Sequence, residues 1–164
     1  MSQWHVAQIN VARLRAAIDD PAVAEFVAGL EPVNRLADES PGFVWRLQTE
    51  DGDATAVRAY DDELVIVNMS VWASLDQLAD FVYRSGHGGF LRRKREWFER
   101  SGEAHMALWW TEAGRLPSVE EGAARLETLR ASGPSAAAFT FRHPFPPPDG
   151  RDGVAVDERN TCSA

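Results

Sequence analysis

Polar and apolar residues alternate along residues 65–72 and again along residues 4–12, which predicts two β-strands. Successive side chains of a strand point to opposite faces of its sheet. In both segments one face is aliphatic, and the other carries amides, a hydroxyl and an indole. We call these the aliphatic face (Ala7, Ile9, Val11, Val67, Met69 and Val71) and the amide face (Gln8, Asn10, Asn68, Ser70 and Trp72).

The other predicted elements follow from capping residues and periodicity. Helices are expected after Asp20-Pro21 with a kink at Pro32, after Ser74, over 89–100, and after Ser118. Further strands are expected over 43–50 and 104–112. Residues 139–148 are expected to be extended, because their prolines exclude a central strand. The order is then β-α-β-β-α-(α)-β-α.

This order predicts an α+β fold: a ferredoxin-like, split βαβ antiparallel sheet with helices on one face. Residues 1–148 would form one domain, and the polar residues 149–164 a disordered tail. The helices are expected on the aliphatic face. The uncovered face then predicts a homodimer, sheet against sheet, with the amides in the enclosed space.

Composition narrows the function classes. The net charge of −8 argues against a nucleic-acid-binding protein. The single cysteine, Cys162, allows neither a disulfide nor a zinc site within one chain. No secretion signal and no run of apolar residues long enough for a membrane span is present, so a cytoplasmic protein without membrane contact is expected. Metal ligation is not expected.

Four segments carry a resemblance to a known family: VNMSVWASLDQLADFVYRSGH, LRRKREWF, ALWWTEAGRLPSVEEGAARLETL and AFTFRHPF. They resemble a bacterial domain family of unknown function in the dimeric α/β-barrel superfamily, which is similar to antibiotic-biosynthesis monooxygenases. The resemblance covers roughly residues 3–147 and implies a dimeric α/β barrel. Relatives in that superfamily include cofactor-independent monooxygenases, polyketide cyclases and haem-degrading enzymes, and a shared fold alone does not fix the reaction.

The amide face supplies the candidate site. The expected catalytic residues are Asn68 and Trp72, with His87 at the mouth of the cavity as a group that can move a proton near neutral pH. The expected substrate-binding residues come from several elements: Gln8, Asn10, Arg46, Ser70, Tyr83, and one of Trp109 and Trp110. A satisfied sheet face with one packed indole would give the same pattern.

Three functions are compatible with these residues. The first is cofactor-independent oxygenation of an aromatic or polyketide-like metabolite, in which the substrate carbanion itself reduces oxygen. The second is cyclisation, dehydration or isomerisation without oxygen, and the third is a module that binds a small molecule without turnover. Haem is an alternative ligand because haem-degrading relatives resemble this chain at Asn10, Trp72 and His87, although His87 lies farther along the chain than that pattern expects.

Overall fold

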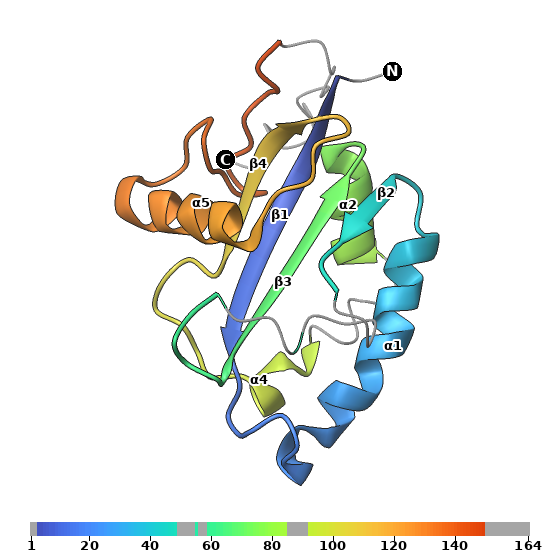
Figure 1. Ribbon diagram of the computed structural model, residues 1–164, viewed down its shortest axis with the longest axis vertical. Coiled ribbons are helices and arrows are strands. Elements are labelled where there is room, and N and C mark those ends of the chain that lie inside the picture. Colours follow the sequence, from blue (N-terminus) through green and yellow to red (C-terminus); the bar gives the residue numbers. More distant parts are fainter. Residues whose placement is uncertain (1–2, 49–54, 56–58, 85–91, 150–164) are drawn as a thin grey trace, which may run out of the picture.

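A four-stranded antiparallel sheet in the order β2-β3-β1-β4 forms the centre of the molecule (Figure 1). The computed structural model describes residues 3–48, 55, 59–84 and 92–149. Its strands are β1 (Trp4–Arg13), β2 (Phe43–Arg46), β3 (Val65–Trp72) and β4 (Met106–Glu112). Its helices are α1 (Ala24–Glu39), α2 (Leu75–Arg84), α4 (Lys94–Trp97) and α5 (Val119–Ser132), and a 3-10 turn, η1 (Pro21–Val23), precedes α1.

The capping residues act as the sequence predicts. The Asp20 carboxylate accepts a hydrogen bond from the backbone of Ala22 at 2.8 Å and begins η1. Ser74 and Ser118 cap α2 and α5, since each hydroxyl accepts from the backbone amide three residues later, at 3.2 and 3.1 Å. Gly133 ends α5 with a φ of 73°, which favours glycine. These contacts fix where the chain turns between sheet and helix.

The strand pairing confirms the α+β, ferredoxin-like prediction. The central strands β1 and β3 are antiparallel, with Asn10 opposite Asn68 and Gln8 opposite Ser70. The outer strands β2 and β4 flank them, so the chain order β1-α1-β2-β3-α2-β4 is the split βαβ arrangement. The register brings the polar residues of β1 and β3 side by side on the amide face.

The side on which α1 and α2 pack differs from the prediction. Trp72 and Val6, both on the amide face, form one buried cluster with Leu75 and Leu78 of α2 and Ala37 of α1. The expectation that these helices cover the aliphatic face is therefore wrong. The amide face also carries apolar residues at both ends of its polar row. Helix α1 packs against both of these ends, and α2 packs against the end at Trp72.

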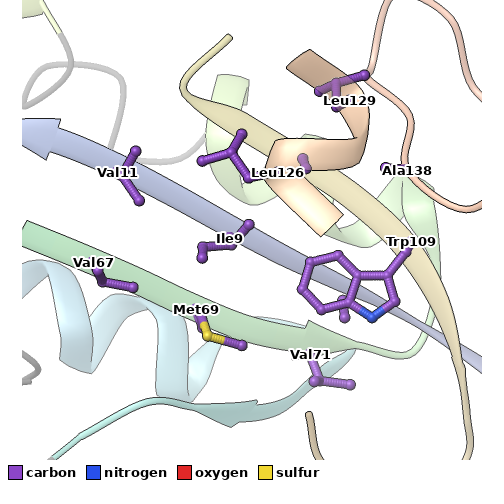
Figure 2. Close-up of a cluster of buried hydrophobic side chains, with 11 residues drawn as sticks. Ile9, Val11, Val67, Met69, Val71, Trp109, Leu126, Leu129 and Ala138 are labelled. Atoms are coloured by element: carbon purple, nitrogen blue, oxygen red, sulfur yellow. The ribbon is translucent and has the colours of Figure 1, made fainter. Parts of the chain in front are cut away.

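Helix α5 covers the aliphatic face, so helices lie on both faces of the sheet and not on one. Figure 2 shows Leu126 and Leu129 of α5 above Ile9 and Met69 of the sheet. Gly122 allows the close approach, because a Cβ there would lie 3.0 Å from the Cδ1 of Ile9 and 3.0 Å from the Cε of Met69. The sequence analysis expected that no segment of the chain would cover the second face of the sheet. The structure shows that α5 packs on one face while α1 and α2 pack on the other.

Two further elements differ in extent from the prediction. The helix expected over 89–100 is described only from residue 92, and α4 ends at Trp97, where Phe98 pairs with Leu14 in an isolated bridge. The strand expected over 43–50 ends at Arg46 after an irregularity between Phe43 and Trp45. The predicted tail, 149–164, lies outside the described residues from position 150 onward.

Candidate functional site

Four side chains on the amide face form one hydrogen-bonded row across β1 and β3. The Nε2 of Gln8 donates to the Oδ1 of Asn68 at 2.7 Å and to the Oγ of Ser70 at 2.9 Å. The Nδ2 of Asn10 donates to the Oε1 of Gln8 at 3.3 Å. Gln8 is buried, and this network uses both of its amide hydrogens, so its side chain is held in one orientation. These residues therefore lie together on one face, as the alternation along the two strands predicts.

The network leaves hydrogen-bond donors on Asn68 and Ser70 unused by the other residues of the row. The Oδ1 of Asn68 faces Gln8, so its Nδ2 points elsewhere, and no acceptor for it occurs among the described residues. Asn68 is exposed although it lies on an inner strand of the sheet. The Oγ of Ser70 accepts from both Gln8 and the Nε1 of Trp72, at 2.9 Å each, so its own hydrogen is also available. Of these two groups the Asn68 amide is exposed, whereas Ser70 is buried.

Two separate apolar clusters bound the row at its ends. One cluster contains Trp72 of β3 and Ala37 of α1. The other contains Phe26 of α1, with Leu30 and Ile66 packed against it. Along α1 the distance from Leu30 to Ala37 is about 10 Å, at about 1.5 Å per residue. Since Asn68 is exposed between the clusters, α1 does not pack on the sheet continuously there. Within the row Asn68 is exposed and Asn10 is half-buried, whereas Gln8 and Ser70 are buried.

Trp72 packs at one end of the polar row. Its ring stacks on Phe81 of α2 at 5.0 Å between centroids and meets Phe43 of β2 edge-on at 5.5 Å. Trp72 is fully buried, and its Nε1 donates to Ser70. It therefore orients the Ser70 hydroxyl and does not itself present a face to solvent.

Arg46 lies on the amide face, opposite Ser70 in the β2–β3 register. Its side chain is only 11% exposed and is bound to the carboxylate of Asp38 on α1, with the Nε 2.8 Å from the Oδ1 and the Nη2 3.3 Å from the Oδ2. This two-pronged pair neutralises the guanidinium and ties α1 to β2. Sequence reasoning missed Asp38, although its place next to the sheet-facing Ala37 is a signal that could have found it.

Three predicted site residues lie away from the row. Trp109 is on the aliphatic face under α5, where the guanidinium of Arg125 lies 5.9 Å from its ring centre. Trp110 shares the amide face but is buried, and its Nε1 donates to the carbonyl of Phe145 at 2.8 Å. Tyr83 is 62% exposed on α2 and does not join the network. His87 lies outside the described residues.

The described residues offer no group of three or more His, Cys, Asp or Glu side chains that could hold a metal ion. Within the same residues no helix is long and apolar enough to cross a membrane. The groups of the row itself are neutral: amides and one hydroxyl. Such groups suit the binding of a carbonyl, enolate or phenolate oxygen.

Residues 5–155 match the model of a domain of unknown function, DUF3291. The chain belongs to this family. The match spans nearly all of the described residues, including both strands that carry the polar row. No curated protein matches the sequence. The resemblance to a bacterial family of unknown function is thereby confirmed.

Solved structures give similarity at the level of the fold. SnoaB, a cofactor-independent oxygenase from Streptomyces nogalater, is 20% identical over 70% of this chain and 98% of its own, with a TM-score of 0.47. A protein of unknown function from Nitrosomonas europaea, NE2512, is 10% identical over 71% of this chain and 97% of its own, with a TM-score of 0.45. A dabb family protein with a ferredoxin-like fold from Mesorhizobium loti is 12% identical over 70% and 100%, with a TM-score of 0.42.

Proposed function

We propose that this protein is a cofactor-independent oxygenase that acts on a phenolic, fused-ring or polyketide-like small molecule. The observation that carries the proposal is the Nδ2 of Asn68, an exposed donor on an inner strand whose orientation is fixed by Gln8. A donor held in place before the substrate arrives stabilises developing negative charge without reorganisation. A substrate bound there through an enolate or phenolate oxygen would be in its deprotonated, electron-rich form.

The proposed reaction needs only the substrate and molecular oxygen. Loss of a C–H proton from a methylene group gives a carbanion whose charge is delocalised onto the bound oxygen atom. One electron passes to molecular oxygen, the resulting radical pair combines to a peroxide, and loss of water leaves a new carbonyl group. In balance, the methylene group and one molecule of oxygen give the carbonyl group and one molecule of water. His87 stays the sequence-based candidate for the proton acceptor.

Oxygen uptake with anthrone, a fused-ring ketone with a phenolic tautomer, tests the proposal. We expect one molecule of oxygen consumed per anthraquinone formed, at a rate above the spontaneous oxidation without protein. Asn68→Ala should lower kcat about 10²- to 10³-fold, as expected for the loss of one oxyanion donor. Arg35→Ala, on the exposed side of α1, is the matched control and should leave the rate unchanged.

Other outcomes would select a different function. An isomeric product formed without oxygen would indicate a cyclase or isomerase, and saturable binding without any product would indicate a binding module. A haem absorption band on titration with haemin would indicate haem binding instead. A rate with Asn68→Ala equal to that of the unmodified protein would contradict the role proposed for this residue.

A homodimer also stays a prediction, and its predicted interface is the amide face. Residues of α1 and α2 pack against Val6 and Trp72 on that face, and α5 packs on the aliphatic face. A dimer that joins the two amide faces would therefore have to form beside α1 and α2. Light scattering at micromolar concentration decides the question, and a monomer mass would reject the dimer.

A further inference from the structure

A cavity of about 310 Å³ lies where the end of α1 and the turn into β2 meet α2 (Figure 1). Small-molecule sites in proteins begin at about this volume. Among the described residues, those of the polar row of β1 and β3 do not line it, so it is a separate place in the molecule. Its lining comes from one side of α2, at spacings of three and four residues, and from the turn: Gln77, Asp80, Phe81, Arg84, Ser40 and Pro41.

Gln77 presents a hydrogen-bond donor to this cavity. Its Oε1 accepts from the hydroxyl of Ser74 at 3.1 Å, and its backbone amide donates to the same hydroxyl oxygen at 3.2 Å. Its side chain lies over Gly42, which has a φ of 83° and where a Cβ would be only 2.8 Å from the Cβ of Gln77. These contacts hold the side chain in place. No acceptor for its Nε2 occurs among the described residues, so this group can donate to a bound molecule.

Ser40 presents the complementary acceptor. Its hydroxyl donates its one hydrogen to the carbonyl of Leu36 at 2.6 Å, so the oxygen can only accept from a ligand. Phe81 adds an aromatic surface, and its ring is held by stacking on Trp72 at 5.0 Å between centroids. A donor and an acceptor beside an aromatic ring suit a flat ring that carries one polar group of each kind.

The charged residues of the lining neutralise one another. The Nη1 of Arg84 lies 3.3 Å from the Oδ1 of Asp80, and both side chains are exposed, at 77% and 60%. Because the pair carries no net charge, it favours neither an anion nor a cation over a neutral molecule. The other polar groups of the lining, on Gln77 and Ser40, are neutral as well.

We propose that this cavity binds a small neutral aromatic molecule with a carboxamide or lactam group. The carbonyl oxygen of that group accepts from the Nε2 of Gln77, its N–H donates to the Oγ of Ser40, and its ring packs against Phe81 and Pro41. A carboxylate would offer no hydrogen to Ser40, whose own hydrogen is bound to Leu36, so the neutral amide is preferred. Binding here is independent of the oxygenation proposed for the polar row.

An NMR titration of ¹⁵N-labelled protein with benzamide tests the proposal. The side-chain amide signal of Gln77, which is identified by its loss in Gln77→Glu, should shift with a Kd in the millimolar range that is usual for so small a ligand. The backbone signals of Gly42 and Phe81 follow binding in the variants. Acetophenone, which keeps the ring and the carbonyl but has no N–H, should bind about five- to tenfold more weakly, the contribution of one neutral hydrogen bond. Benzoate should also bind more weakly than benzamide.

Two variants separate the two hydrogen bonds. Gln77→Glu keeps a side chain typical of a capping box but removes the donor, so it should weaken benzamide about five- to tenfold. Ser40→Ala should lower the affinity for benzamide to that for acetophenone and change acetophenone less than about twofold. Asp76→Asn, at the exposed position before Gln77, is the matched control and should change neither affinity. Asn68→Ala, in the polar row, should also change neither.

The dispersion of the NMR signals checks that each variant is folded. No shift of the Gln77 signal, equal binding of benzamide and acetophenone, or a preference that survives Ser40→Ala would overturn the proposal. Tighter binding of benzoate would overturn the neutral ligand class. A weaker affinity for benzamide in Asn68→Ala would place the probe at the polar row and reject this site. Absence of oxygen uptake from anthrone would reject the oxygenase alone and leave this site standing.

Discussion

Replacing Gly122 by Ala tests how closely α5 packs on the aliphatic face. The added Cβ would lie 3.0 Å from the Cδ1 of Ile9 and 3.0 Å from both the Cε and the Sδ of Met69. Carbon atoms in contact are normally about 3.5–4.0 Å apart, so these side chains or the helix must move. Overpacking of this kind costs about 1–3 kcal/mol.

Helix propensity acts in the opposite direction. Alanine is favoured over glycine inside a helix by about 1 kcal/mol, so the clash must exceed this gain for the variant to lose stability. The balance predicts that Gly122→Ala lowers the free energy of unfolding by about 1 kcal/mol. For a chain of 164 residues that corresponds to a melting temperature lower by about 2–4 °C.

Urea denaturation followed by tryptophan fluorescence measures the change, and two variants separate its causes. Ala124→Gly, at an exposed position of α5, calibrates propensity alone and should cost about 1 kcal/mol. Ile9→Val should cost less in the Gly122→Ala background than alone, by at least about 0.5 kcal/mol, because it removes a clashing methyl group. A Gly122→Ala protein more stable than the original by the full propensity gain would refute the close packing of α5.

Three further outcomes follow from the contacts. Trp72→Phe should cost about 1–2 kcal/mol in urea denaturation, because the Ser70 hydroxyl loses its indole donor while the aromatic packing is kept. Asp38→Asn should cost about 1 kcal/mol by the same measurement, since it removes the carboxylate charge that the largely buried Arg46 binds. His105 is exposed, yet partial desolvation by its neighbours, and then two nearby cations, lower the pKa of its imidazole. The unfolded chain therefore binds this proton more tightly, and melting temperatures should fall from about pH 7 to about pH 5, with a smaller fall in His105→Gln.

Much of the fold was predictable because its signals are local. The alternation over 65–72 determines that Asn68, Ser70 and Trp72 point to one face of the sheet. The same alternation in β1 determines the face to which Gln8 points. Cap residues such as Ser118 mark helix starts through a single hydrogen bond to a backbone amide nearby in the chain. Contacts of this range do not depend on how the elements pack, so the sequence determines them directly.

The side on which each helix packs was not predictable in the same way. Both faces of the sheet contain enough apolar surface to hold a helix: Ile9 and Met69 on one, Val6 and Trp72 on the other. A count of polar residues favoured the aliphatic face for all helices. Ala37 of α1 and Leu75 of α2 pack against the apolar end of the amide face, and such contacts between segments far apart in the chain are not revealed by periodicity in a single segment.

The position of the polar row argues for a function over a purely structural role. Apolar side chains in place of Asn10 and Asn68 would join the two clusters under α1 into one core and would add burial of about 25 cal/mol per Å² of apolar surface. The chain instead keeps amides there, held by the buried Gln8, with one donor of the exposed Asn68 left unused by the described residues. A network that served only stability would satisfy its own donors. Local features that forgo stability without a structural gain are typical of functional sites, and here that feature is the exposed Asn68 amide held by the buried Gln8.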